Sequence, residues 1–156
     1  MEATVVREIE LRFRGKGRTV RTSLSNPSDA ARFFRSVIGP DVRENFLAVY
    51  LDGRHRPIGW RVVSIGTATT CLVHPRETFQ PAVCLGAASI IVGHNHPSGD
   101  PNPSAEDISV TKRLAHAGAI LGIKLCDHVV FGSEAFVSLR ERMPALFVDD
   151  NASPRG

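Results

Sequence analysis

Two histidines one residue apart, His94 and His96, end an apolar run and are the residues best suited to bind a metal ion. In an extended chain, side chains at positions i and i+2 point to the same side, so both imidazoles can reach one cation. Pro97 favours extended backbone at His96. After a loop rich in Pro and Gly, Asp107 adds a carboxylate. Two histidines, one carboxylate and a position open to water form a ligand set typical of catalytic zinc sites.

Ser104 and Asp107 also have the spacing of a helix N-cap and an acidic residue at the third helical position. Taken alone, this pair needs no explanation beyond capping, and a short H-x-H motif also occurs in polar loops. The combined pattern is more specific. It reads H-x-H, seven residues, Ser, two residues, Asp.

That combined spacing resembles the JAMM signature of the JAB/MPN metalloproteases, and HNHPSGDPNPSAED resembles the RadC branch of that superfamily. Further blocks are similar to the same branch over about residues 43–140. They are RENF followed by LAVYLDGRHRPIG, SIGTAT at 64–69, VHPRETF at 73–79 and LCDHVVFG at 125–132. The resemblance implies an α+β (mixed α/β) fold, with a cytidine-deaminase-like mixed sheet flanked by helices. The contiguous letters HNH do not indicate an HNH nuclease, whose motif residues are dispersed.

The resemblance also implies a role for each polar residue of the site. Zn²⁺ would be held by His94, His96 and Asp107, with water as the fourth ligand. Glu44 would be the general base, and Ser104 would donate a hydrogen bond to the oxyanion. Competing carboxylates for the base are Glu77 and Glu106. Two further polar residues, Asp127 and His128, either orient a ligand histidine or hydrogen-bond within the core.

The implied function is a zinc-dependent JAMM-type metallohydrolase that cleaves amide bonds of a peptide or protein, as a peptidase or isopeptidase. One alternative is a RadC-like DNA-associated factor, linked to repair or to mobile elements. Another is a non-catalytic MPN interaction module, but the complete residue set argues against it. Full-length RadC proteins carry a helix-hairpin-helix region before the JAB domain, and residues 1–42 are too short for one. The chain therefore resembles the stand-alone form.

Secondary structure that would position these residues is predicted from hydrophobic periodicity and capping signals. Strands are expected at 5–13, 18–24, 43–52, 57–65, 87–93, 123–131 and 135–139. Helices are expected from Asn26 or Ser28 to 38, from Pro75 to 86 with a kink or break at Pro81, and from Ser104 to 119. Residues 1–42 are predicted to form an extension that packs on a 43–140 metallohydrolase domain, and 141–156 a tail.

Composition adds limits on location and partners. The 156 residues include no apolar run of about 18 residues and no signal-peptide core, so a cytoplasmic protein is expected. The net charge is +3, and the first 24 residues are rich in arginine. This basic arm predicts either a solvated hairpin face or a weak contact with nucleic acid. The cysteines, Cys71, Cys84 and Cys126, are expected to be buried reduced thiols, because their spacing suits neither disulfides nor a zinc site.

Overall fold

A mixed β-sheet forms the centre of the molecule. The computed structural model describes residues 9, 10, 12, 22–39, 43–66 and 73–147. Within them the strand order is β2-β1-β3-β4-β5. The β3–β4 pair is parallel, and the β1–β2, β1–β3 and β4–β5 pairs are antiparallel. The strands are β1 (Glu44–Leu51), β2 (Pro57–Gly66), β3 (Ser89–Asn95), β4 (Lys124–Phe131) and β5 (Phe136–Ser138). This arrangement confirms the α+β class expected from the sequence.

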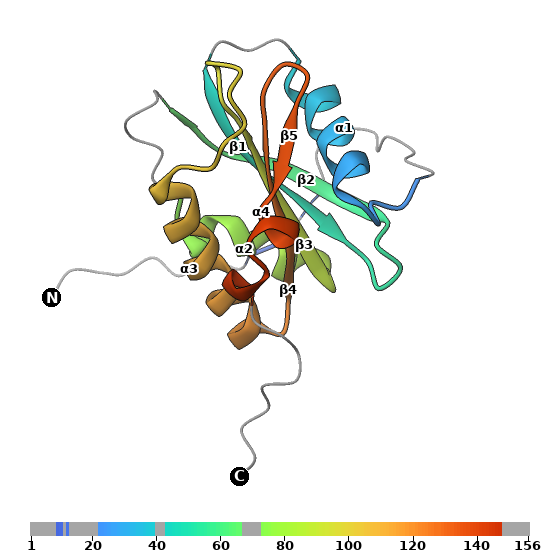
Figure 1. The fold of residues 1–156 in the computed structure, drawn as a ribbon. Coiled ribbons are helices and arrows are strands. Elements are labelled where there is room, and N and C mark those ends of the chain that lie inside the picture. The colour runs from blue at the N-terminus through green and yellow to red at the C-terminus, as the bar shows by residue number, and fades with distance from the viewer. Residues whose placement is uncertain (1–8, 11, 13–21, 40–42, 67–72, 148–156) are drawn as a thin grey trace, which may run out of the picture.

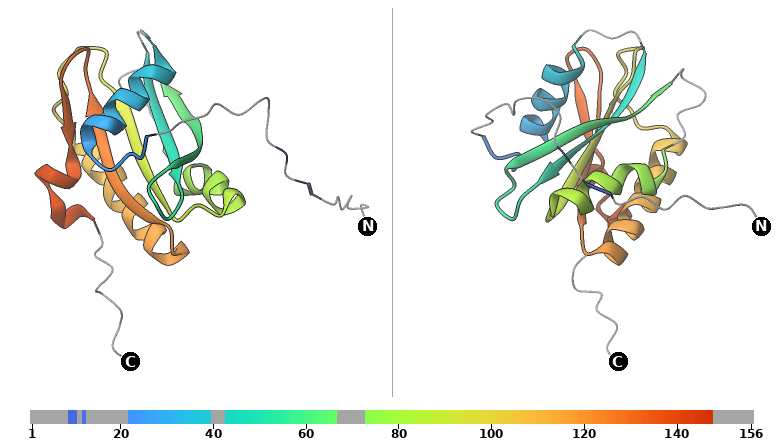
Figure 2. Two further views of the ribbon diagram at one scale, coloured as in Figure 1. Left: turned by 90° about the vertical axis from the view of Figure 1, so that its right-hand side faces the viewer. Right: turned by 180° about the vertical axis from the view of Figure 1, so that it is seen from behind.

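Helices cover both faces of the sheet (Figures 1 and 2). Helix α1 (Pro27–Ile38) lies on one face, where Phe34 packs in a core cluster with Leu47 and Phe131. Helices α2 (Pro75–Leu85) and α3 (Ala105–Leu121) lie on the other face, where Phe79 and Leu114 belong to a second cluster. A short helix α4 (Leu139–Arg142) and a 3₁₀ turn η1 (Pro144–Leu146) follow β5. Each face of the sheet therefore has its own apolar core.

The helix starts follow the capping signals of the sequence. Asn26 is the N-cap of α1, and its side chain accepts a hydrogen bond of 2.9 Å from the backbone N–H of Asp29. Pro75 opens α2, as expected. Of the kink or break expected at Pro81, the break does not occur, because α2 continues through Pro81 to Leu85. A proline removes only one backbone donor, and Phe79 and Ala82 on either side are buried against the core.

Topology brings distant segments to one end of the sheet. Strand β3 ends at Asn95, and α3 connects it to the parallel strand β4, so α3 begins beside the carboxyl end of β3. Strand β1 runs antiparallel to β3, with Phe46 paired to His94, so its first residue, Glu44, lies at the same end. Polar residues from three separate parts of the chain are therefore collected there.

Several sequence expectations fall outside the described residues. The predicted strand at 5–13 and its partner at 18–24 lie largely there, as do most of the basic arm and Cys71. Of the other cysteines, Cys126 is partly buried, but Cys84 is exposed, which contradicts the expectation of burial. Cys84 lies near the end of α2, on its solvent side. Among the helices that the structure describes, none has both the length and the apolar character that crossing a membrane requires.

Candidate metal centre

Four predicted site residues meet at the end of the sheet. His94 lies within β3, one residue later than the sequence placed the strand end, and His96 follows the strand. Glu44 opens β1, and Asp107 lies in the first turn of α3. One nitrogen or oxygen atom from each of these four side chains lies within 4.8 Å of the others. The structure thus brings together the three predicted ligands and the predicted base.

The distances between donor atoms fit a small tetrahedral ion. The two histidine Nε2 atoms are 2.9 Å apart. Asp107 places Oδ1 3.0 Å from Nε2 of His94 and Oδ2 3.4 Å from Nε2 of His96. Zinc–nitrogen bonds of about 2.0–2.1 Å in tetrahedral geometry put neighbouring donors about 3.3 Å apart. Two imidazole nitrogens and one carboxylate at this spacing are therefore a suitable donor set for such an ion.

Solvent access differs across the cluster. The side chain of His94 is 1% exposed, whereas those of His96 and Glu44 are 17% and 15% exposed. An oxygen of Glu44 lies 3.7 Å from Nε2 of His94. The open side of the cluster therefore faces Glu44 and His96.

Ser104 has the capping role that its spacing predicted. Its hydroxyl oxygen accepts from the backbone N–H of Asp107 at 3.1 Å, and its own N–H donates to Oδ2 of Asp107 at 2.7 Å. These two bonds form a capping box and fix the Asp107 carboxylate in the first turn of α3. The Ser104 oxygen is thus an acceptor in the cap, and its hydroxyl proton can still be donated.

The loop that joins the two halves of the motif is anchored to the end of the sheet. The backbone N–H of His96 donates to the carbonyl of Phe131 at 3.0 Å, and the N–H of Gly99 donates to the carbonyl of His96 at 2.9 Å. Gly99 packs so closely on Gly132 that a side chain at Gly132 would overlap the Gly99 carbonyl. These contacts hold His96 near the end of β3 after the strand itself has ended.

His128 contacts one of the predicted ligands, His94, directly. Its Nε2 lies 2.9 Å from Nδ1 of His94, and its Nδ1 lies 2.7 Å from the hydroxyl of Thr111. The side chain is fully buried. Burial lowers the pKa of His128 to about 3, and the neighbouring His94 contributes to this shift.

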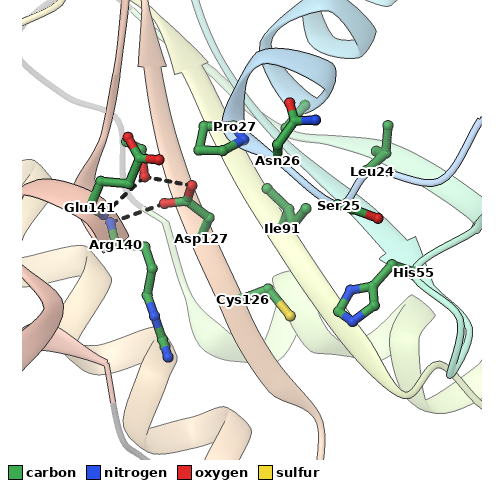
Figure 3. Close-up of a pocket in the computed structure, with 12 residues that line it drawn as sticks. Leu24, Ser25, Asn26, Pro27, His55, Ile91, Cys126, Asp127, Arg140 and Glu141 are labelled. Carbon is green, nitrogen blue, oxygen red and sulfur yellow. Dashed lines mark hydrogen bonds between the residues drawn. The ribbon is translucent and has the colours of Figure 1, made fainter.

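Asp127 points to the opposite face of the sheet (Figure 3). It accepts hydrogen bonds from the hydroxyl of Ser138 at 2.7 Å and from the backbone N–H groups of His128 and Arg140. Burial raises the pKa of its carboxyl, and these hydrogen bonds oppose the shift. It lines a pocket of about 200 Å³ beside the start of α1. Asp127 thus ties β4 to β5 and α4, and it does not contact the metal cluster.

Asn95, between the two histidines, was not singled out from the sequence. Its side-chain oxygen accepts from the backbone N–H of Asn45 at 2.7 Å, and its side-chain NH₂ donates to the carbonyl of Arg43 at 2.8 Å. The two backbone partners flank Glu44. Asn95 therefore holds the segment that carries the predicted base against the strand that carries His94.

The remaining candidate residues lie away from the cluster. Glu77 is in the first turn of α2 and pairs with the neighbouring Arg76 at 3.1 Å. Glu106 is exposed in the first turn of α3, beside Asp107 in sequence but not in the cluster. The histidines without ligand spacing are all exposed: His55, His74 and His116.

Comparison with known proteins identifies the family. A model described as the RadC-like JAB domain matches residues 24–144, which is most of the chain. The chain belongs to this RadC-like JAB family. The match includes every candidate ligand and the candidate base described above, from Glu44 to Asp107.

Individual relatives agree with this assignment. The RadC-like JAB chain is 44% identical over 142 residues to a UPF0758 protein of Shouchella clausii. It is 43% identical over 135 residues to one of Geobacillus thermodenitrificans and 46% identical over 122 residues to one of Bacillus cereus. These alignments cover 91%, 86% and 78% of the chain but only 62%, 60% and 54% of the three relatives. The names of these relatives specify no reaction.

Electrostatics of the RadC-like JAB site favour an ionised carboxylate among the imidazoles. Burial opposes ionisation of Asp107, but hydrogen bonds from His94 and His96 outweigh it and hold the pKa of this carboxyl well below its usual range. The same contact with Asp107 raises the pKa of His96, and burial opposes that shift. A cation that replaces the proton between these side chains would meet a carboxylate that is already charged.

Proposed function

We propose that this RadC-like JAB domain is a zinc-dependent hydrolase of amide bonds in a peptide or protein, acting as a peptidase or isopeptidase. The observation that carries the proposal is the convergence of Glu44 on the His94, His96 and Asp107 donor set. A structural zinc site needs four protein ligands and no adjacent base. Here the fourth side chain is a carboxylate on the open side of the cluster.

Three side chains would hold the ion, namely His94 and His96 through Nε2 and Asp107 through its carboxylate. When bound, zinc lowers the pKa of a water molecule toward ~7 and polarises a carbonyl group. Proton transfer and stabilisation of the oxyanion are assigned to side chains of the protein. The ligand side chains are held from β3, the following loop and α3, so the site does not depend on a single flexible segment.

Glu44 moves the proton in this mechanism. Its carboxylate takes a proton from the attacking water and gives that proton to the amine nitrogen that leaves. The position 3.7 Å from Nε2 of His94 and the partial exposure of the side chain suit a group that must reach both water and substrate. One carboxylate on one side of the cluster can serve both steps, so no second acid is required.

Ser104 stabilises the negative charge that develops on the substrate oxygen. Its hydroxyl oxygen is engaged by the N–H of Asp107, which orients the hydroxyl at the edge of the cluster. The proton of that hydroxyl is then directed to the oxyanion. The residue has two compatible roles, because the cap uses its oxygen and the reaction uses its proton.

The test is to compare Glu44→Gln with Glu106→Gln, in protein loaded with one equivalent of zinc and incubated with a library of peptides and isopeptide-linked conjugates. Glu44→Gln should retain zinc and lose activity by about 10²–10⁴-fold, the range expected for a lost general base. Glu106→Gln, which changes an exposed carboxylate nearby, should behave like the unsubstituted protein. Full activity in Glu44→Gln would refute the base assignment.

Zinc content provides the second arm of the test. Protein purified without a chelator should contain about one zinc per chain, and a His94→Ala/His96→Ala double variant should contain none. If neither preparation binds zinc, the proposal fails at its first step. Salt-sensitive binding to duplex DNA without hydrolysis would instead favour the DNA-associated alternative.

A further inference from the structure

A chain of three buried contacts connects the backbone of one candidate ligand to the side chain of another. The hydroxyl of Thr111 lies 2.6 Å from the backbone carbonyl of Asp107. The same hydroxyl oxygen lies 2.7 Å from Nδ1 of His128. Nε2 of His128 lies 2.9 Å from Nδ1 of His94. Thr111, His128 and His94 are all buried, at 0%, 0% and 1% exposure.

The direction of each hydrogen bond follows from the first. A carbonyl oxygen can only accept, so the single hydroxyl proton of Thr111 is directed to Asp107. The Thr111 oxygen must then accept from His128, which places the proton of His128 on Nδ1. His128 is buried between a hydroxyl and an imidazole, where a charged ring would be unfavourable, so it is neutral and its Nε2 accepts. The acceptor at Nε2 requires the proton of His94 to be on Nδ1.

We infer that Thr111 and His128 are positioning residues that fix the tautomer of His94, leaving its Nε2 lone pair directed at the metal site. Neither residue touches the metal position. They act through His94, as partners of ligand histidines commonly do. The inference rests on the metal site of the proposed function, but it does not depend on hydrolysis.

The tautomer of His96 is fixed more simply than that of His94. Nδ1 of His96 lies 2.8 Å from the backbone carbonyl of Asp100, a direct acceptor that fixes its tautomer without further residues. His94 lies inside β3, where the backbone groups of the strand are engaged with β1 and β4. Nδ1 of His94 instead contacts the side chain of His128. Nε2 of His128 can accept from His94 only while the proton of His128 is on Nδ1, where the Thr111 hydroxyl accepts it. The tautomer of His94 therefore depends on a residue that does not contact it.

The direct test is nuclear magnetic resonance of ¹⁵N-histidine-labelled, metal-free protein at mildly alkaline pH. His94 should show a protonated, pyrrole-type Nδ1, because Nε2 of His128 accepts from it. An unprotonated, pyridine-type Nδ1 at His94 would overturn the inference. Because no metal is present, this result is independent of whether the protein binds zinc or hydrolyses anything.

The matched variants are Thr111→Val and Thr111→Ser. Valine has nearly the shape of threonine but cannot accept from His128, so the protons of His128 and His94 should both move to Nε2. Nδ1 of His94 should then lose its proton, and zinc affinity, measured by competition with a chelator, should fall by about 10–100-fold. Thr111→Ser keeps the hydroxyl and should preserve both the pattern and the affinity. An unchanged pattern and affinity in Thr111→Val would contradict the inference.

His96 supplies an internal control for folding. The protonation of the His96 ring nitrogens depends on Asp100 and should remain the same in every variant that folds.

His128→Gln is the second variant, because the amide oxygen of the introduced glutamine can accept from Nδ1 of His94 in place of Nε2 of His128. It should retain the His94 pattern. A folded His128→Gln protein with an unprotonated Nδ1 at His94, or a folded Thr111→Ser protein with weakened zinc binding, would argue against the tautomer role.

Discussion

Asn95 holds the backbone on both sides of Glu44, by accepting from Asn45 N–H at 2.7 Å and donating to the Arg43 carbonyl at 2.8 Å. The strand that carries the candidate ligand His94 thus also positions the proposed base. A backbone ladder alone would not do this, because the regular β1–β3 pairing begins only at Phe46 and His94. The middle residue of H-x-H is therefore as much a part of the site as the two histidines.

Substituting Asn95 should affect the base and spare the ligands. Asn95→Asp can still accept from Asn45 but cannot donate to Arg43, so the Glu44 segment should shift. Because small displacements of a catalytic group can lower rates by about 10²-fold, we expect a fall in kcat of that order with zinc content unchanged. The control is Asn102→Asp, since within the described residues Asn102 bonds to the exposed Asp100 and Arg142 side chains. Loss of zinc in Asn95→Asp, or undiminished kcat, would count against this role.

Ser104→Gly separates capping from catalysis. Glycine is itself an acceptable N-cap, so stability should fall by only a few tenths of a kcal/mol. The oxyanion donor, in contrast, is removed completely, and kcat should fall by about 10²–10³-fold. Chemical denaturation and steady-state kinetics on the same preparation measure the two effects. Parallel losses of stability and rate would indicate that Ser104 only caps α3.

Zinc should stabilise the folded protein through His96. A ligand that binds only the folded state at 100 times its dissociation constant adds about 2.7 kcal/mol to the free energy of unfolding. We therefore expect a higher Tm in the presence of zinc and no zinc-dependent rise in His96→Ala. The matched control is His116→Ala, an exposed histidine on α3, which should retain the full rise. An equal rise in both variants would place the bound zinc elsewhere.

Gly93→Ala tests how closely α1 packs behind the site. A Cβ at Gly93 would lie 2.5 Å from two ring atoms of Phe34, which is itself fully buried and stacked on Phe131. We expect a loss of about 1–3 kcal/mol in the free energy of unfolding, as for other overpacked cores. Gly53→Ala should be nearly neutral, because nothing lies within 4 Å of its added Cβ. Urea denaturation of both variants measures the free energy of unfolding, and equal values for the two would contradict this close packing.

His128 should make the metal-free protein sensitive to acid. Burial lowers its pKa from 6.5 to about 3, so between these values the unfolded chain binds a proton that the folded chain does not. The free energy of unfolding should therefore fall as the pH drops from 6.5 toward 3. The loss should be smaller in His128→Gln than in the unsubstituted protein, whereas exposed His116→Gln should leave it unchanged. The lowered pKa of Asp107 also makes its contribution to the free energy of unfolding fall in acid, but all three proteins contain Asp107.

Local signals in the sequence were sufficient to predict the helix caps and to single out the candidate ligands that the structure brings together. His94 and His96 share one side of an extended chain because of the two-residue period, and Ser104 with Asp107 forms the capping box that their spacing predicted. Asn26 capped α1 for the same local reason. The base was different, because a strand carboxylate is usually only solvated. Glu44 was identified through the resemblance of its segment, and the β1–β3 pairing then brought it to the cluster.

The roles of Asp127 and His128 could not be separated from the sequence, because a β-bulge decides between them. Ile90 pairs with Leu125 and Ile91 with Asp127, so Cys126 is an extra residue in β4. Strict alternation from buried Leu125, on the α3 side, would have put Asp127 on the side of the metal cluster. The bulge reverses this and directs His128 to His94. Asn95 and Thr111 were missed because their partners are set by pairing between distant segments.

The four side chains that converge at the end of the sheet also have a definite charge balance. Glu44 and Asp107 contribute two negative charges, and histidines that present a lone pair contribute none. A divalent ion would make this largely buried group electrically neutral, whereas a monovalent or trivalent ion would leave a net charge that the surroundings solvate poorly. Imidazole nitrogen in turn disfavours magnesium and calcium, which prefer oxygen ligands. If the site binds a metal ion as proposed, valence and ligand type together favour zinc and divalent transition metals.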